Sequence, residues 1–221
     1  MNDVKLIATT TGAGELEGKS PQDVISYVAR VSNPHNQDNF HTAGGLLRYC
    51  IKHEHWSIFE TASMTLEINT NRGIAAQVLR HRSFTYQEFS QRYADPNEMD
   101  TVFVTRECRL QDDKNRQNSI PNEDTALDVW WEQQQRFVIS MIQKIYKEAR
   151  EKGIAKEQAR AILPEGNTVS RLYVNGTIRS WIHYVELRSA NGTQKEHAEL
   201  AMEIAKAIGK IFPMATEFLD G

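Results

Sequence analysis

The sequence predicts an α+β fold, a central β-sheet flanked by helices, in a single domain over residues 1–221. Three observations predict it. The chain has 221 residues, of which 40% are hydrophobic and 25% charged, as in an ordinary globular protein. Short segments with alternating apolar and polar residues, typical of half-buried strands, occur among longer segments with helical spacing. The chain has no internal repeat, low-complexity tract or clear linker, so one domain is the simplest organisation.

The first eighty residues are expected to form two strands and three helices. The second strand has the clearest pattern, since Met64, Leu66 and Ile68 alternate with polar residues. Pro21 stands in the first turn of the first helix, where its missing N–H costs nothing. The expected elements are a strand at 4–10, helices at 21–31 and 42–52, a strand at 60–69 and a helix at 71–80.

A long helix is expected from about residue 122 to 152. Its apolar stripe includes Trp130, Phe137 and Met141, and Gly153 follows at the position that commonly ends a helix. At 1.5 Å per residue, about 30 residues make a helix of roughly 45 Å, which is long for a globular protein. The stripe is typical of a core helix, and a helix that forms an oligomer is the alternative.

The segments on either side of the long helix are mostly short. Residues 101–105 resemble a strand, and the polar stretch that follows is expected to be a solvated loop over 111–124. Beyond the long helix the expected elements are a helix at 156–163 stopped by Pro164, a strand at 169–174, a helix at 177–187, and a last helix opened by a capping box at 193–196.

Composition and charge exclude several classes of protein. The 26 basic and 29 acidic residues give a formal net charge of −3, so the chain is not a polycation that coats nucleic acid. No apolar run approaches the ~18 residues that span a bilayer, and residues 1–7 are too polar for a signal peptide. Cys50 and Cys108 form no CxxC pair, and the histidines lack zinc-binding spacing. A cytoplasmic protein with no metal, no membrane and no nucleic-acid partner is expected.

The turn at residues 12–20 ends in Gly-Lys-Ser and resembles a phosphate-binding loop. A P-loop needs four residues between its first glycine and the Gly-Lys pair, so that backbone N–H groups converge on phosphate. Here Gly14 leaves three residues and Gly12 leaves five. The G-x-G-x-x-G pattern of dinucleotide-binding proteins also fails, because Glu17 stands where its third glycine belongs. A surface turn is favoured, and a P-loop-like NTPase is kept as a less favoured alternative.

Arginines concentrate in two segments of this slightly acidic chain. Residues 72–92 contain four Arg, a single acid at Glu88 and no Lys. Guanidinium groups offer the planar, bidentate donors that suit phosphate and carboxylate. A second series runs over 160–188, and there Arg179 and Arg188 lie half a turn apart on one predicted helix. These two arginines can both contact a ligand only if the site is large or is shared between subunits. A non-catalytic module that binds nucleotides or RNA through these arginines remains an alternative.

The arginine-rich segment resembles a known family signature. Arg80-His81-Arg82, followed after seven residues by Ser90, is similar to the R-H-R-x7-S pattern of the flavin-dependent thymidylate synthases (ThyX type). Four further blocks resemble the family in the same order. They are residues 29–32 (Ala-Arg-Val-Ser), 53–60 (His-Glu-His-Trp-Ser-Ile-Phe-Glu), 159–164 (Ala-Arg-Ala-Ile-Leu-Pro) and 175–188, which begins Asn-Gly-Thr-Ile-Arg-Ser-Trp and ends Glu-Leu-Arg.

The resemblance implies a reaction, a cofactor and an assembly. Members of the family convert dUMP to dTMP with a one-carbon unit from 5,10-methylenetetrahydrofolate. NADPH reduces a bound FAD, and the reduced flavin supplies the hydride. The family has a ThyX-like α+β fold and forms homotetramers whose active sites contain residues of several subunits. Sharing of that kind accounts for arginines on opposite sides of one helix.

The resemblance also implies residue roles, position by position. Arg188 matches the catalytic arginine, which faces the uracil ring and stabilises the charge that builds on N3 and O4 before C5 attacks. The other positions that match dUMP-binding residues are Gln77, Arg80, Glu88, Ser90, Arg92 and Arg160, with Arg92 and Arg160 expected at the phosphate. The positions that match FAD-binding residues are Ser57, Arg80, His81, Arg82, Thr177, Arg179 and His183.

The chain departs from the family pattern at a few of these places. Thr177 and His183 stand where family members often carry Asn. The histidine that family members often have just past the activating arginine, linked to folate, is replaced by Asn191 and Gly192. His197 is expected either to substitute for it or to be an exposed helix histidine. Because neither cysteine lies in a matched block, no covalent thiol is expected.

Overall fold

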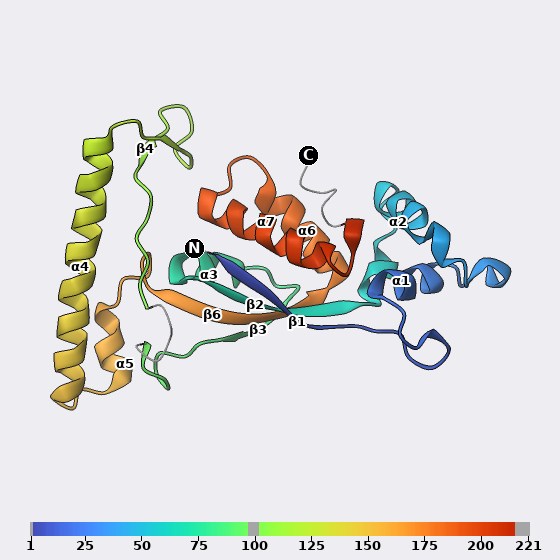
Figure 1. Ribbon diagram of the computed structural model, residues 1–221, viewed down its shortest axis with the longest axis horizontal. Helices are drawn as coiled ribbons and strands as arrows, with labels where there is room; N and C mark the ends of the chain where they lie inside the picture. Colours follow the sequence, from blue (N-terminus) through green and yellow to red (C-terminus); the bar gives the residue numbers. More distant parts are fainter. Residues whose placement is uncertain (1, 97–101, 215–221) are drawn as a thin grey trace.

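A four-stranded antiparallel sheet forms the centre of the molecule (Figure 1). The computed structural model describes residues 2–96 and 102–214. The strand order is β1-β2-β6-β3, so β2 and β6 are the two central strands. The strands are β1 (Asp3–Thr9), β2 (Ser63–Asn71), β3 (Thr85–Glu88) and β6 (Val169–Thr177).

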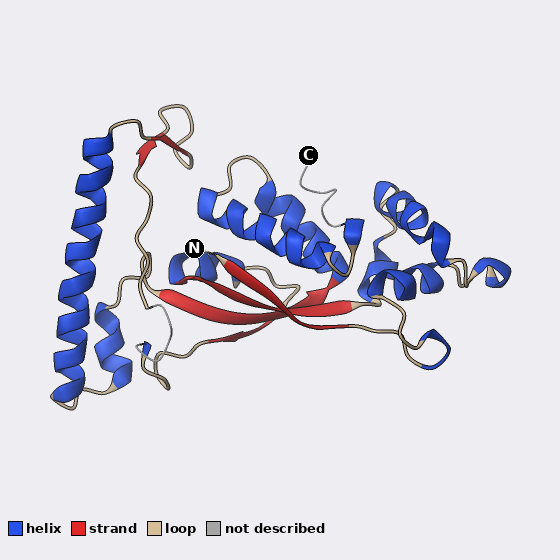
Figure 2. Cartoon of the chain, in the orientation of Figure 1, coloured by secondary structure: helices blue, strands red, loops and turns tan. Residues whose placement is uncertain are grey.

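One face of this sheet is apolar because the central strands pair in a register that aligns their apolar residues. Leu66 lies opposite Val174 and Ile68 opposite Leu172, and all four side chains are fully buried. The helices α6 (Ile178–Ser189) and α7 (Lys195–Gly209) cover this face (Figure 2). Each contributes apolar side chains to the same core. The alternation of strand side chains therefore decides which face the helices cover.

The opposite face of the sheet is polar. Tyr173 donates a hydrogen bond of 2.8 Å to the Glu67 carboxylate, and Arg171 Nε donates one of 2.9 Å to Asn69. Arg171 also lies 3.7 Å from Glu67. These residues alternate with the core residues of β2 and β6, so the two faces of the sheet have opposite character.

A glycine brings the segment that contains β3 close to the sheet. The ring of Phe84 lies directly over Gly176 of β6, and a Cβ atom at Gly176 would lie 2.3 Å from that ring. Phe84 also packs against Trp181 of α6, with 4.4 Å between ring centroids. This close approach fixes the arginine-rich segment against the sheet and α6.

Two helices form a lobe at one end of the sheet, α1 (Pro21–Ala29) and α2 (Ala43–Lys52). The 3₁₀ helix η4 (Trp56–Glu60) follows α2 and leads into β2. Ser20 caps α1 in a capping box with Asp23, and Lys19 Nζ lies 4.3 Å from the centroid of the Phe40 ring. The Gly-Lys-Ser turn therefore leads directly into α1, with Ser20 as its N-cap.

A second helical unit stands at the other end of the sheet (Figure 1). It consists of α4 (Thr125–Glu151), α5 (Lys156–Ala159) and the 3₁₀ helix η6 (Arg160–Ile162). The side chain of Asp124 caps α4. Most of the apolar stripe on α4 is exposed in the single chain, with Phe137 at 62% and Trp130 at 53% exposure. The expectation that this stripe packs into the core of the same chain, which is the commoner case for such a pattern, is wrong.

The structure corrects several further expectations about local elements. The stretch 111–124 is not simply a loop, because β4 (Arg109–Gln111) and β5 (Ser119–Pro121) form a hairpin there. The strand-like segment 102–105 makes one isolated bridge, between Phe103 and Thr168; residue 101 lies outside the described residues. No capping box forms at 193–196, since Gln194 is the N-cap of α7 and makes no side-chain cap bond.

The remaining helix near the site is short. α3 (Arg72–Val78) follows β2 directly and is capped by Asn71, whose side chain accepts from the Ile74 backbone N–H at 3.1 Å. Among the described residues, no helix is both long enough and apolar enough to cross a membrane.

Candidate active site

Most of the predicted site residues fall into three clusters on one chain. The first, here called the Arg188 cluster, comprises Gln77, His81, Tyr184, Arg188 and His197. Arg188 Nε, in the last turn of α6, donates a hydrogen bond of 2.9 Å to His81 Nε2. The His81 ring packs edge-on against Tyr184, with 4.7 Å between centroids. Tyr184 and Arg188 share one face of α6 because they are four residues apart.

His81 is neutral at physiological pH, and this determines both the hydrogen bonding and the electrostatic surroundings of Arg188. Burial, and then the charges of Arg188 and Arg80, lower the pKa of His81 from 6.5 to about 4. The neutral ring keeps a lone pair on Nε2 that accepts the Arg188 proton. No acid pairs with Arg188 in the part of the chain that the structure describes. Among the described residues nothing neutralises its positive charge, and its two terminal nitrogens remain available to a ligand.

His197 lies buried within the same cluster. Its Nε2 is 2.9 Å from the Tyr184 hydroxyl and its Nδ1 is 3.0 Å from Gln77 Oε1. The side chain is 0% exposed, so the alternative of an exposed helix histidine is wrong. Burial, and then the charge of Arg188, lower the pKa of His197 from 6.5 to about 3.

The depressed pKa of His197 predicts a loss of stability in mild acid. Between pH 6.5 and 3 the unfolded chain binds a proton at His197 that the folded chain does not, so stability falls as the pH falls. We expect His197 alone to lower the free energy of unfolding by about 2 kcal/mol between pH 7 and pH 5. Urea unfolding at pH 7, 6 and 5 measures this. A His197→Asn variant should show a shallower pH dependence; equal slopes in the two proteins would contradict the prediction.

The second cluster, here called the Arg179 cluster, lies at the other end of α6. Arg179, in the first turn of α6, pairs with Glu60 of η4. Ser57, also in η4, has an exposed side chain. This part of α6 packs beside η4 and the lobe of α1 and α2 (Figure 1). The structure thus brings together the 53–60 block and the block that begins at 175.

Two further members of the Arg179 cluster depart from the family pattern, His183 and Thr177. The His183 ring packs against Trp56 with 4.3 Å between centroids, and its Nδ1 lies 3.4 Å from Glu186. Thr177 caps α6, with its hydroxyl accepting from the Ser180 backbone N–H at 3.3 Å. The hydroxyl of Thr177 is therefore engaged in starting the helix, whereas His183 and Trp56 form a partly exposed aromatic pair.

The third cluster, here called the Arg160 cluster, lies where the chain after β3 meets α5. Ser90, Arg92 and Glu157 line a hollow of about 460 Å³, and Arg92 lies 3.5 Å from Glu157. Arg160 lines an adjoining hollow of about 360 Å³ that shares Glu157. Arg160 makes no ion pair with any acid within residues 2–96 and 102–214. Two guanidinium groups and a hydroxyl therefore lie beside connected concave surfaces.

Three predicted residues lie between these clusters. Glu88 accepts hydrogen bonds from Ser170 at 2.7 Å and from Arg72 at 3.3 Å, so its carboxylate is held by the sheet and α3. Arg80 and Arg82 are exposed, and neither pairs with an acid among the described residues. They project from the same loop as His81, which places free positive charge next to the Arg188 cluster.

In the part of the chain that the structure describes, the hollows beside the Arg160 cluster are separate from the other two clusters. The two hollows of the Arg160 cluster contain no member of the other clusters. Arg179 and Arg188 are separated by roughly 13 Å along the helix axis at 1.5 Å per residue.

The sequence did not indicate three residues that shape the Arg188 cluster. Tyr86 of β3 lies with its hydroxyl 2.9 Å from the Val78 carbonyl oxygen and 2.6 Å from that of His81, and so holds the loop between α3 and β3. Gln194 accepts from Gln77 Nε2 at 2.8 Å. Tyr184 was also unassigned, although its helical spacing from Arg188 is a signal that could have found it.

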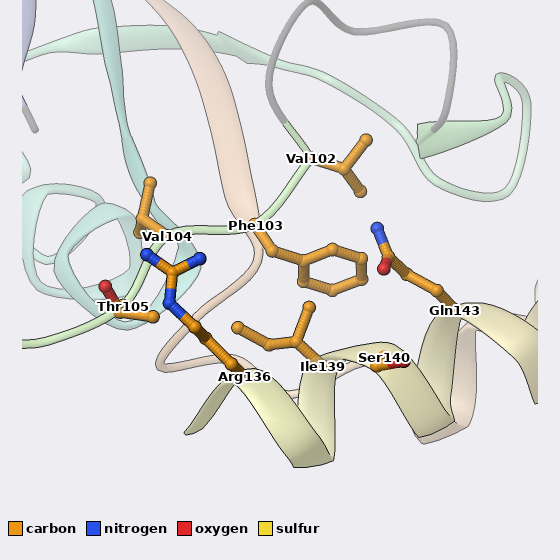
Figure 3. A pocket seen from close by; sticks show the side chains of 8 residues that line it. All are labelled: Val102, Phe103, Val104, Thr105, Arg136, Ile139, Ser140 and Gln143. Carbon is orange, nitrogen blue, oxygen red and sulfur yellow. The ribbon is translucent and has the colours of Figure 1, made fainter. Parts of the chain in front are cut away.

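A further groove of about 710 Å³ lies between residues 102–105 and α4. In Figure 3 the ring of Phe103 points toward Ile139 and Gln143 of α4, and Arg136 lies at one end. None of the predicted site residues lines this groove. The described residues contain no group of three or more His, Cys, Asp or Glu side chains placed to hold a metal ion.

Comparisons with known proteins identify the family. Residues 7–214 match the family described as thymidylate synthase complementing protein. Over 217 residues the chain is 52% identical to a probable flavin-dependent thymidylate synthase of Paramecium bursaria Chlorella virus 1, covering 98% of both chains. Over 220 residues it is 47% identical to the flavin-dependent thymidylate synthase of Synechocystis sp., covering 99% of both.

The fold is also found in a solved structure. The UMP/dUMP methylase PolB from Streptomyces cacaoi, bound with 5-Br dUMP, aligns with a TM-score of 0.80 over 100% of this chain and 95% of that one, at 22% identity. The sheet and its helices are therefore an arrangement shared with that methylase. Together with the sequence matches over nearly the whole length, this means that the chain belongs to the thymidylate synthase complementing protein family, the flavin-dependent thymidylate synthases.

Proposed function

We propose that the protein methylates dUMP to dTMP in the cytoplasm, with 5,10-methylenetetrahydrofolate as carbon donor and NADPH as the source of electrons through FAD. The observation that carries this is the uncompensated guanidinium of Arg188, held by a neutral histidine. The C5 carbon of uracil is a weak nucleophile and gains strength only as negative charge builds on N3 and O4. A guanidinium facing that edge stabilises the developing charge.

The neutral state of His81 matters for this chemistry. A protonated His81 would repel Arg188 and would have no lone pair to accept its Nε proton. With its pKa at about 4, His81 orients the guanidinium and adds no competing charge. Arg188 is thus fixed at one nitrogen and free at the other two, which suits a planar, two-point contact with the uracil edge.

The remaining dUMP contacts follow from the Arg160 cluster and the adjacent loop. Arg92 and Arg160 bind the phosphate, because they lie beside adjoining hollows and Arg160 has no acid partner in the described chain. Ser90 adds a hydroxyl to the same surface. Gln77, Arg80 and Glu88 complete the set, and Gln77 is held within the Arg188 cluster by its contact with His197.

The described residues also fit FAD. Arg80 and Arg82 are exposed, have no acid partner in the described part of the chain, and suit the pyrophosphate. The pair of Trp56 and His183 presents flat rings against which an aromatic ring system stacks. Arg179, Ser57, Thr177 and His81 are the other proposed contacts. When bound, FAD carries electrons from NADPH to the transferred one-carbon unit.

We place no covalent thiol in the reaction. Burial raises the pKa of the Cys50 thiol, and burial followed by Asp128 raises that of Cys108. Both shifts disfavour the thiolate, which is the nucleophilic form. Neither cysteine lies in any of the three clusters.

The assembly we propose is a homotetramer with shared active sites. Two observations support it. The apolar stripe of α4 is exposed in the single chain, and helices with such stripes normally cover them with a partner. The three clusters also lie apart on one chain, and sites built from several subunits bring such clusters together.

One experiment tests the function and the thiol-free mechanism together. The purified protein should be yellow with FAD and should form dTMP from dUMP, methylenetetrahydrofolate and NADPH. We expect a Cys50→Ala, Cys108→Ala variant to retain wild-type turnover within about twofold, because neither thiol touches the reacting atoms. Flavin absorbance and radiolabelled dTMP measure the two properties. Colourless protein without dTMP formation contradicts the function, and a folded, flavin-loaded but inactive double variant contradicts the thiol-free mechanism.

A further inference from the structure

A chain of hydrogen bonds runs from the core of the Arg188 cluster to the surface. It passes from the Tyr184 hydroxyl to His197, then to Gln77, Gln194 and Glu196, over distances of 2.9, 3.0, 2.8 and 2.9 Å. Glu196 also accepts from Arg109 at 2.5 Å. The chain connects α6, α7 and α3 to the β4–β5 hairpin, elements that are distant in the sequence.

The direction of every donor in this chain is set by its last member. Although burial opposes ionisation, the bond from Arg109 and the other donors lower the pKa of Glu196, so Glu196 is a carboxylate and only accepts. Gln194 must therefore present its NH₂ to Glu196 and its carbonyl to Gln77. Gln77 in turn must donate its NH₂ to Gln194, and its carbonyl is left facing His197.

The same logic fixes the proton on His197. Because the Gln77 carbonyl can only accept, His197 must carry its proton on Nδ1, and its bare Nε2 accepts from the Tyr184 hydroxyl. His197 therefore holds one end of the Gln77 amide while Gln194 holds the other. A buried imidazole with both nitrogens bonded has no freedom to turn, so it is a rigid support.

The amide of Gln77 still has bonding capacity. Each of its polar atoms makes one hydrogen bond in the described structure, and an amide has two lone pairs on oxygen and two N–H donors. One lone pair and one N–H therefore remain, with directions that cannot be exchanged by flipping the amide. A ligand beside Gln77 meets an acceptor and a donor in a fixed arrangement.

We infer that His197 is a positioning residue that fixes the orientation of the Gln77 amide for recognition of dUMP. This rests on the proposed function, since Gln77 is a proposed dUMP contact. Three observations carry it: the complete burial of His197, the pairing of both its nitrogens, and the chain of directed donors that ends at Glu196. His197 touches Gln77 and not the ligand.

The experiment compares His197→Leu with His197→Asn in the full-length, FAD-loaded protein. Leucine fills the space but leaves the Gln77 carbonyl without its donor, whereas the asparagine NH₂ replaces Nδ1–H. Loss of one neutral hydrogen bond corresponds to an effect of about three- to tenfold. We expect His197→Leu to raise the KM and the calorimetric Kd for dUMP by that factor with kcat less affected, and His197→Asn to restore most of the loss.

Two controls separate positioning from a merely structural role. Ile204→Ala destabilises α7, the helix that carries His197, from a fully buried position, but an isoleucine side chain forms no hydrogen bond to any of the linked residues, so the dUMP affinity of this variant should stay at the wild-type value. In a Gln77→Leu background, His197→Leu should change the dUMP affinity little, because the amide that it orients is gone.

The outcomes distinguish this inference from the proposed function. The positioning role is overturned if His197→Leu binds dUMP with wild-type affinity, or if Ile204→Ala loses as much dUMP affinity as His197→Leu. The proposed function still stands in either case if the wild-type protein forms dTMP. The positioning role is also overturned if His197→Leu lowers the dUMP affinity of the Gln77→Leu variant by the same factor as it lowers that of the wild-type protein. Wild-type protein that neither binds dUMP nor forms dTMP overturns the proposed function, and the inference with it.

Discussion

Replacement of Arg188 by alanine is expected to abolish dTMP formation while leaving FAD bound. Removal of one donor aimed at developing negative charge typically costs about 10²–10³ in kcat. Arg188 also brings a charge that no acid within residues 2–96 and 102–214 neutralises, so we expect at least the upper end of that range. FAD should remain because the Arg179 cluster and the exposed Arg80 and Arg82 do not depend on Arg188. Single-turnover dTMP formation and the flavin spectrum measure the two properties.

The matched control for this prediction is Arg188→Lys. Lysine keeps the positive charge but has no Nε donor for His81 and no planar pair of terminal donors. We expect an intermediate loss of kcat, because charge alone supplies part of the stabilisation. Substantial turnover by Arg188→Ala, or equal rates for the alanine and lysine variants, would contradict the activating role.

Acidic substitutions on the exposed stripe of α4 are expected to prevent assembly and eliminate turnover. Phe137 and Met141 lie one helical turn apart and are exposed in the single chain, at 62% and 48%. Phe137→Glu with Met141→Glu therefore costs the isolated fold little, whereas a charge buried at a subunit interface costs several kcal/mol. We expect light scattering to report a species smaller than a tetramer, circular dichroism to remain native, and dTMP formation to fall at least about 100-fold.

The control for this variant is Lys144→Glu, an acidic substitution at an exposed position of the same helix whose acid partner, Glu148, lies at 4.0 Å. It should leave assembly and turnover unchanged.

Co-expression supplies a second measurement. If one site takes Arg160 and Arg188 from different subunits, mixed assemblies of the inactive Arg160→Ala and Arg188→Ala variants should regain turnover. A fully active tetramer carrying both glutamates would contradict the α4 interface.

Local sequence patterns predicted the elements whose formation depends on residues close together in the sequence. The alternation of Met64, Leu66 and Ile68 identified β2, because one face of that strand is buried. The long helix was predicted to within a few residues, since Asp124 caps its start and Gly153, with φ of 82°, follows its end. The amphipathic pattern of α4 could not reveal what covers its apolar stripe, because an interface and a core select the same residues.

The elements that were missed depend on contacts between distant segments. β3 has only four residues, and its pairing with β6 defines it. The same is true of the site. The family signature contains His81 and a separate matched block contains Arg188, but their hydrogen bond joins residues 107 positions apart. The burial of His197 likewise results from the packing of α7 on α6, which no spacing within α7 specifies.

The close approach of Phe84 to Gly176 has an evolutionary consequence. Any side chain at position 176 would overlap the Phe84 ring, and a smaller residue at 84 would leave a void against Trp181 and Gly176. Neither position can drift alone without loss. We therefore expect the two to vary as a correlated pair among related sequences, so that the route from one functional combination to another passes through a destabilised intermediate or a simultaneous double change.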